Sequence, residues 1–299
     1  MSTYLSAVKK AVATGTLQGD HEDPISSSII IKEVLEGHSR AFNPSPPEER
    51  THLKSPSAPF TLEDFKRIYA TFKSSLSGAD PSPRDRLLLA ALSLGLGGCL
   101  RPGEYLRTND TQRPEAILSV SQLSFSISRS TEGILIESPL SWSQFRLLMA
   151  TSPPPHRWTL KGITLLLRCS KTDQSRRGQE VRIEDPLCVQ LIHDYLFKVR
   201  VPNYRDDPIE VLLFEPTTGI PIHYSALRMT RHFREFLSSN GIANPHDFTL
   251  KSLRSGAAQS LLDGGASDIA VRAKGRWTNS TTPLKHYLNR PSHSSSMKD

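Results

Sequence analysis

The sequence predicts an α+β fold that is mostly α-helical and carries one small antiparallel β-sheet. Apolar residues recur at helical spacing before residue 100 and again after residue 186. Between residues 117 and 184 the pattern changes to short β-rich segments separated by turn residues. The polar loop KTDQSRRG (171–178) ends in glycine between two of these segments, which is typical of a hairpin.

The N-terminal part predicts a short helical segment followed by a linker. Weak helical patterns cover 4–15 and 26–41, and we place the segment at 1–45. Residues 46–58 are rich in proline and serine without periodicity, so they form the predicted linker. The main domain then spans 59–290, and 291–299 is expected to be a flexible tail.

Two helices are predicted at the start of the main domain. In FTLEDFKRIYATF, Thr61 is a candidate N-cap with Asp64 in the first turn, and the apolar stripe is Phe65, Ile68, Tyr69 and Phe72. Residues 84–100 are apolar on nearly every side, which indicates a helix buried at the centre of the domain.

The sheet and the later helices follow in order. The strand segments are LSVSQLSFSIS, GILIES, GITLLLRCS and QEVRIE, and residues 138–160, which contain SPPPHRW, are expected to be an irregular insertion. Helices are predicted at 187–199, 225–239, 250–264 and 268–274.

Composition narrows the function classes. The 299 residues carry a formal charge of +7 with a pI near 9.4, which favours a polyanionic partner such as nucleic acid. Three cysteines without C-x-x-C spacing argue against a disulfide framework and a zinc site. No signal-peptide pattern and no run of about 20 apolar residues is present. We therefore expect a protein of the nucleus, if the source is eukaryotic, or otherwise of the cytoplasm, that is not secreted.

Arg101 directly follows the predicted buried helix, where an unpaired charge is unfavourable. Glu104, three residues on, is the simplest partner. The alternative is that Arg101 faces a phosphate while Glu104 supports the site.

A group of cations surrounds the predicted hairpin. A charged loop is commonly a solvated surface, but a basic hairpin can also lie along a DNA groove. The members are Lys161, Arg168, Lys171, Arg176, Arg177 and Arg182.

Lys251 and Arg254 lie three residues apart in TLKSLRSGAA, so both are expected on one face of the first turn of a helix. Two cations at the positive end of a helix dipole indicate a bound anion, although a surface pair without function is the alternative. Trp277 and Tyr287, taken singly, are ordinary core or surface residues.

Together these positions resemble the tyrosine recombinase, or phage-integrase, family over roughly 59–290. The resemblance lies in the order of APFTLEDFKRIY, GCLRPGEYL, a hairpin lysine, KSLRSGAA, GRW and a tyrosine about ten residues later. It implies the catalytic fold of that family and makes 1–45 a partial helical core-binding, SAM-like segment. The catalytic residues that it implies are Arg101, Lys171, Lys251, Arg254, Trp277 and Tyr287, with Glu104 in support. We assign DNA contacts to Arg168, Arg176, Arg177, Arg276 and Lys285.

Two features depart from the family pattern. Lys251 stands where the family usually has histidine, and Arg101 and Lys171 are 70 positions apart, which is longer than in compact bacterial members. The long spacing and the GRW form resemble eukaryotic mobile-element recombinases of the crypton and DIRS type.

The resemblance implies strand cleavage and rejoining through a 3′-phosphotyrosyl intermediate, without metal, ATP or other cofactor. Tyr287 is then the nucleophile, and Lys171 the general acid for the leaving 5′-oxygen. The implied partners are double-stranded DNA and three further copies of the chain, held as a tetramer through the C-terminal tail. A type IB topoisomerase-like enzyme and an inactive transposon-derived DNA-binding protein remain as alternatives.

Overall fold

The computed structural model describes residues 57–109, 112–131, 134–151, 158–168, 178–200, 211–214 and 223–277. The chain divides into two compact units, Met1–Ser55 and Pro56–Asp299, and all described residues belong to the second. The predicted helical segment at 1–45 and the predicted tail at 291–299 lie outside the described residues.

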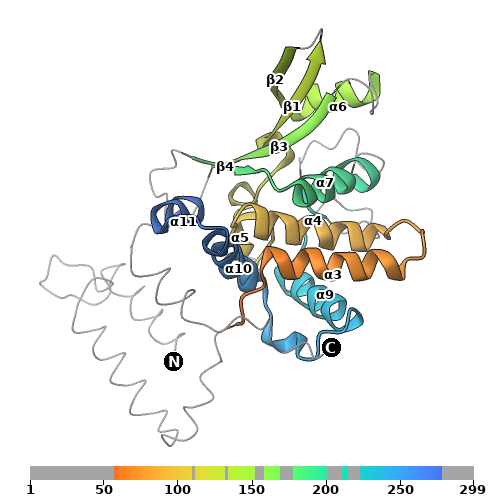
Figure 1. The fold of residues 1–299 in the computed structure, drawn as a ribbon, viewed down its shortest axis with the longest axis vertical. Helices are drawn as coiled ribbons and strands as arrows, with labels where there is room; N and C mark the ends of the chain where they lie inside the picture. The colour runs from red at the N-terminus through yellow and green to blue at the C-terminus, as the bar shows by residue number, and fades with distance from the viewer. Residues whose placement is uncertain are drawn as a thin grey trace, which may run out of the picture. The chain divides into compact units, whose positions relative to one another are not determined.

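The two predicted helices at the start of the domain are confirmed. Helix α3 (Leu62–Ser75) begins at Thr61, whose side chain caps the amide of Asp64 while Asp64 caps Thr61 in return. Helix α4 (Pro83–Gly97) is buried along eleven consecutive residues and packs against α7, α9 and α10, near the centre of Figure 1. A helix that is apolar on all sides therefore forms the middle of the core.

The predicted antiparallel sheet is also confirmed. Its strands are β1 (Leu123–Thr131), β2 (Ile134–Ser141), β3 (Trp158–Leu167) and β4 (Gln179–Ile183), in the order β2-β1-β3-β4. All neighbouring strands are antiparallel, and the register of β1 on β3 shifts between Ser126 and Ile127. Strands β3 and β4 flank the predicted hairpin loop, so they fix both ends of the segment that carries Lys171.

The prediction of an irregular insertion over 138–160 is wrong for the described part of it. Strand β2 runs to Ser141, and helix α6 (Trp142–Thr151) follows it directly. Trp142 and Phe145 are buried, and the Phe145 ring stacks on Phe125 of β1 at a centroid distance of 4.2 Å. The prolines that suggested irregularity lie after this helix, within 152–157, outside the described residues.

The remaining helices agree with the predicted positions. They are α7 (Pro186–Tyr195) continued by the π-helical turn η4 (Leu196–Arg200), α9 (Ala226–Ser239), α10 (Leu250–Asp263) and α11 (Asp268–Gly275). The short α5 (Pro102–Tyr105) was not predicted. Figure 1 shows α5, α10 and α11 beside one end of α4, with β4 next to α11. None of the helices in these described stretches is long and apolar enough to span a membrane.

The segment before α3 crosses α10 at close range. The amide of Phe60 donates to the carbonyl of Ser252 at 3.0 Å, and a Cβ at Gly256 would lie 1.7 Å from the Phe60 carbonyl oxygen. Gly256 therefore permits the contact because it has no side chain. This crossing fixes α10, and with it Arg254, relative to the start of the domain.

Candidate active site

The turn after α4 places Arg101 and Glu104. Cys99 has a left-handed backbone (φ 49°), and Arg101 occupies the N-cap position of the four-residue helix α5. One Glu104 oxygen accepts from the Arg101 backbone amide at 2.7 Å, and the other accepts from its guanidinium Nη1 at 3.0 Å. Glu104 is 5% exposed and Arg101 26% exposed. No other partner among the described residues reaches this guanidinium, so Arg101 keeps several donors for a ligand.

Arg254 projects from the second turn of α10 and is buried. Its Nη2 donates to the carbonyl of Gly275, and its guanidinium carbon lies 4.8 Å from the centre of the Trp277 ring. Its Nη1 is buried without a hydrogen-bond partner among the described residues. A buried donor without an acceptor is unfavourable, so this atom is available to bind an anion.

Arg276 differs from its predicted role as a DNA contact. Its side chain is 5% exposed, and its Nη2 donates to a Glu104 oxygen at 2.6 Å. The guanidinium also lies 3.5 Å from the carbonyl oxygens of Gly98 and Cys99. The side chain points into the protein because Glu104 supplies a buried counter-charge there.

Positive charge dominates the cluster. Burial lowers the pKa of Arg254, and the nearby charges of Arg101 and Arg276 lower it further. Glu104 is the carboxylate at the centre of this group. Three guanidinium groups and one carboxylate leave a surplus of positive charge, which an anion would neutralise.

Lys274 joins the cluster and was not predicted from the sequence. Its amine donates to the carbonyl of Arg182 on β4, and burial lowers its pKa. The sequence KGRW could have indicated it, since Lys274 directly precedes the glycine of the GRW motif. Lys274 ties α11 to the strand that follows the hairpin loop.

The other predicted site residues are placed less directly. Lys251 lies in the first turn of α10, but its side chain is exposed and makes no hydrogen bond or ion pair with the described residues. Arg168 is exposed at the end of β3. Lys171, Arg176, Arg177, Lys285 and Tyr287 lie outside the described residues.

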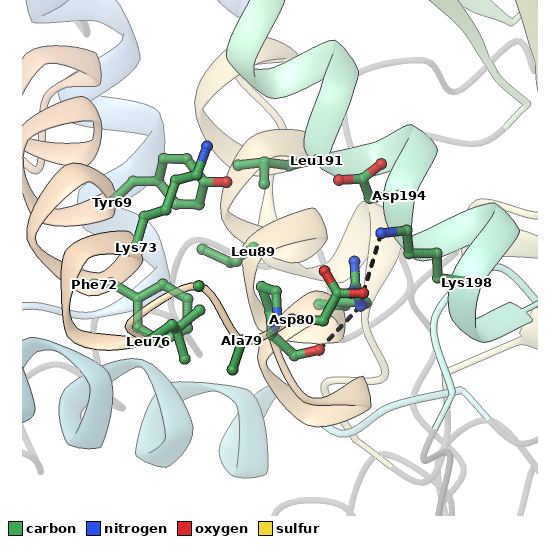
Figure 2. Close-up of a pocket in the computed structure, with 13 residues that line it drawn as sticks. Tyr69, Phe72, Lys73, Leu76, Ala79, Asp80, Leu89, Leu191, Asp194 and Lys198 are labelled. Atoms are coloured by element: carbon green, nitrogen blue, oxygen red, sulfur yellow. Dashed lines mark hydrogen bonds and ion pairs between the residues drawn. The ribbon is translucent and has the colours of Figure 1, made fainter. Parts of the chain in front are cut away.

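Within the described ranges, no group of three or more His, Cys, Asp and Glu side chains could hold a metal ion. A separate pocket of about 330 Å³ lies between α3, α4 and α7 (Figure 2). It is lined by Tyr69, Lys73, Asp80, Lys198 and their neighbours, and it shares no residue with the arginine cluster.

The chain aligns with solved structures of recombinases and of an integrase. The chain aligns with XerH site-specific recombinase bound to difH substrate (pre-cleavage complex) at a TM-score of 0.51 and 11% identity, over 96% of this chain and 66% of that one. It aligns with XerA recombinase at a TM-score of 0.47 and 14% identity, over 96% of this chain and 78% of that one. It aligns with the Tn1549 transposon integrase in complex with transposon right end DNA at a TM-score of 0.45 and 15% identity, over 96% of this chain and 81% of that one. No protein-family model and no curated protein sequence matches the chain.

The fold is that of a tyrosine recombinase catalytic domain. In this fold the sequence brings Arg101, Arg254 and Trp277 together from α5, α10 and the end of α11, although 153 positions separate the two arginines. Two guanidinium groups with unfilled donors beside an indole can bind a tetrahedral or pentavalent phosphate through its non-bridging oxygens.

Proposed function

We propose that the chain is a site-specific DNA recombinase that cleaves and rejoins strands through a 3′-phosphotyrosyl intermediate. The observation that carries this proposal is that Arg254 Nη1 has no hydrogen-bond partner among the described residues, while the Arg101 guanidinium bonds Glu104 through Nη1 and keeps its other donors, in one positively charged cluster. A phosphodiester already carries charge on its non-bridging oxygens, and more charge develops there as the phosphorus becomes pentavalent. Fixed guanidinium donors stabilise that charge without a metal ion.

In the proposed first step, the Tyr287 oxygen attacks phosphorus, and the bond from phosphorus to the 5′-oxygen breaks. The phenol proton passes to a base of the site or to a phosphate oxygen, and Lys171 donates a proton to the leaving 5′-oxygen. The product keeps a phosphodiester bond, now to tyrosine, so a second 5′-hydroxyl can reverse the step without ATP. In this proposal Trp277 donates its indole N–H to the phosphate, and Lys251 contacts the phosphate once DNA is bound.

Double-stranded DNA is the proposed partner, in accordance with the net charge of +7. We further propose that four copies assemble on DNA through the C-terminal tail. A mobile-element origin of the crypton or DIRS type, and a location in the nucleus of a eukaryotic cell, complete the proposal. If the source is not eukaryotic, we place the protein in the cytoplasm.

Covalent trapping tests the nucleophile. A nicked duplex that loses its cleaved fragment prevents rejoining, so the wild-type chain should accumulate as a protein–DNA adduct. Tyr287→Phe removes the attacking oxygen and should abolish the adduct while leaving DNA affinity within about threefold. Mass spectrometry of the adduct should place the DNA on Tyr287. An adduct formed by the phenylalanine variant would contradict the assignment.

One observation favours a second candidate, a DNA-binding protein that no longer cleaves. Lys251 replaces the usual histidine of the family, and its side chain is exposed and makes no hydrogen bond or ion pair with the described residues of the arginine cluster. Such a protein would bind DNA without forming an adduct. A type IB topoisomerase-like enzyme would form the adduct and relax supercoils as a monomer, so measuring the oligomeric state on DNA separates it from a recombinase.

A further inference from the structure

Arg276 has a backbone conformation that non-glycine residues seldom adopt. It follows α11 with φ 54° and ψ 44°, in the left-handed region where Cβ crowds the following carbonyl oxygen. Gly275, immediately before it, is restricted for another reason, since a Cβ there would lie 1.7 Å from the Trp277 ring. A residue with a large cationic side chain thus has a strained backbone conformation. Such a conformation persists only where the surrounding contacts hold it in place.

The contacts that hold Arg276 lead directly to Arg101. Its Nη2 donates at 2.6 Å to the Glu104 oxygen that also accepts the Arg101 backbone amide at 2.7 Å. The second Glu104 oxygen accepts from the Arg101 guanidinium at 3.0 Å. Arg276 and Glu104 are both 5% exposed, so water does not compete strongly for this ion pair.

Arg276 also contacts the turn that precedes Arg101. Its two Nη atoms lie 3.5 Å from the carbonyl oxygens of Gly98 and Cys99, and Cys99 is itself left-handed (φ 49°). One guanidinium therefore contacts three acceptors, two in the turn before α5 and one within α5. The fork of Arg276 suits this task, whereas a lysine ammonium presents a single point charge.

We propose that Arg276 is a positioning residue that holds Glu104, and through it Arg101, in the geometry needed at the scissile phosphate. The inference rests on the proposed recombinase function. Arg276 itself does not touch DNA. Without the Arg276 guanidinium, the Glu104 carboxylate loses its shortest buried contact and can rotate. Rotation of the carboxylate would also break its hydrogen bonds to the Arg101 backbone amide and guanidinium.

The test compares Arg276→Met, Arg276→Gly and Arg276→Lys with the matched control Arg272→Met. Arg272 lies one turn earlier on α11, pairs with Asp268 at 3.7 Å and has no contact with Glu104. Arg276→Gly removes the guanidinium and relieves the backbone strain, so it guards against a variant that simply fails to fold. The melting temperature of each variant is measured alongside.

Adduct formation at saturating DNA should fall about 10- to 100-fold in Arg276→Met and Arg276→Gly, since small displacements of a catalytic group reduce rates on that scale. Arg276→Lys should lie between these and the wild type. DNA affinity should change less than threefold, and Arg272→Met should behave as the wild type. Normal cleavage by both Arg276→Met and Arg276→Gly would overturn the proposal. So would lost DNA affinity with unchanged cleavage at saturation, because that result indicates a direct DNA contact.

A double variant shows whether Arg276 acts through Arg101. If it does, Arg101→Ala with Arg276→Met should cleave as slowly as Arg101→Ala alone. A neutral substrate, with methyl in place of one non-bridging oxygen at the scissile phosphate, should reduce the losses of Arg101→Ala and Arg276→Met together. Losses that multiply in the double variant would overturn the proposal.

A measurement on the free protein separates this inference from the proposed function. The ¹⁵Nε signal of Arg101, assigned by its loss in Arg101→Lys, should report an ordered side chain in the wild type and in Arg272→Met. In Arg276→Met and Arg276→Gly it should report a mobile one. Equal order in all variants would overturn the positioning role. If the wild type forms no adduct, the proposed function fails, and this signal still decides whether Arg276 orders Arg101.

Discussion

Among the described residues, two carboxylates that each bridge two cations, Glu104 and Asp80, differ in burial. Glu104 joins Arg276 at 2.6 Å and Arg101 at 3.0 Å, with 5% of its side chain exposed. Asp80 joins Arg86 at 2.9 Å and Lys198 at 3.3 Å, with 74% exposed. The distances are similar, so the surroundings decide what each bridge contributes.

Solvent access makes the two bridges unequal. Asp80 lies at the edge of the pocket in Figure 2, where water and salt screen its charge. The pKa of Asp80 is lowered by the hydrogen bond from Lys198 and the charge of Arg86, yet the carboxylate would remain hydrated without them. Glu104 has no such alternative, because its partners replace the water it lost on folding.

Glu104→Ala should give the largest loss of stability. It leaves the Arg276 guanidinium buried with only two long contacts and the Arg101 amide without its acceptor. Removing one partner of a buried ion pair costs about 3–5 kcal/mol. Urea denaturation measures this change in the free energy of unfolding, with Glu104→Gln as a control that keeps the shape. A change below about 1 kcal/mol for the alanine variant would mean that burial does not distinguish the two bridges.

Arg254→Ala should have the next largest effect, and on cleavage more than on folding. Its Nη1 has no described hydrogen-bond partner, so we expect that donor to act only when a phosphate is present. Losing one transition-state donor lowers the rate by roughly 100-fold or more, near 3 kcal/mol. Single-turnover adduct formation gives the rate, and Arg234→Ala, an arginine that binds the carbonyls of Phe248 and His246, is the control. Near-normal cleavage by Arg254→Ala would remove it from the site.

Asp185 is an intermediate case between the two bridges. It caps the Cys188 amide at the start of α7 and pairs with Lys66 of α3 at 2.9 Å, with 14% of its side chain exposed. Burial alone would raise the pKa of Asp185, but these hydrogen bonds outweigh it and lower the pKa. Asp185→Ala should cost about 1 kcal/mol, the usual value of an N-cap.

The pH dependence gives Asp185 a sharper test. A carboxyl with a lowered folded pKa contributes stability above its unfolded pKa, near ~3.9, and this contribution is lost as pH falls through the folded pKa. The difference in unfolding free energy between wild type and Asp185→Ala should therefore be full at pH 7 and shrink on acidification. Lys66→Met, which keeps the cap, should show a smaller difference. A gap that persists unchanged at pH 2 would contradict this account.

The sequence predicted the elements of this fold well because each has a local cause. Capping by Thr61 and the all-round apolar character of 84–97 were readable from neighbouring residues. Helix α6 was missed because the prolines after it suggested irregularity, while its anchor, the stacking of Phe145 on Phe125, joins separate elements.

The site was less predictable from the sequence, because its contacts also join residues that are far apart along the chain. The family resemblance predicted Arg101, Glu104, Arg254 and Trp277 as site residues. Arg101, Glu104 and Arg254 lie in the described cluster, and the Trp277 ring lies against the Arg254 guanidinium. The inward turn of Arg276 depends on its left-handed backbone and on a carboxylate 172 positions away. No local pattern carries that information.

Asp80→Asn should have the smallest effect of all. The amide keeps an oxygen that can accept from Arg86 and Lys198, and Arg86 Nε retains its 3.0 Å bond to the Pro81 carbonyl. The Asp80 carboxylate is 74% exposed and is screened by water and salt, although Arg86 is only 8% exposed, so the melting temperature should change little at both 50 mM and 500 mM NaCl. Lys198→Met is the matched control, because it removes the other side of the bridge. A clear loss of stability in Asp80→Asn would show that the charge of the bridge, and not its burial, governs both sites.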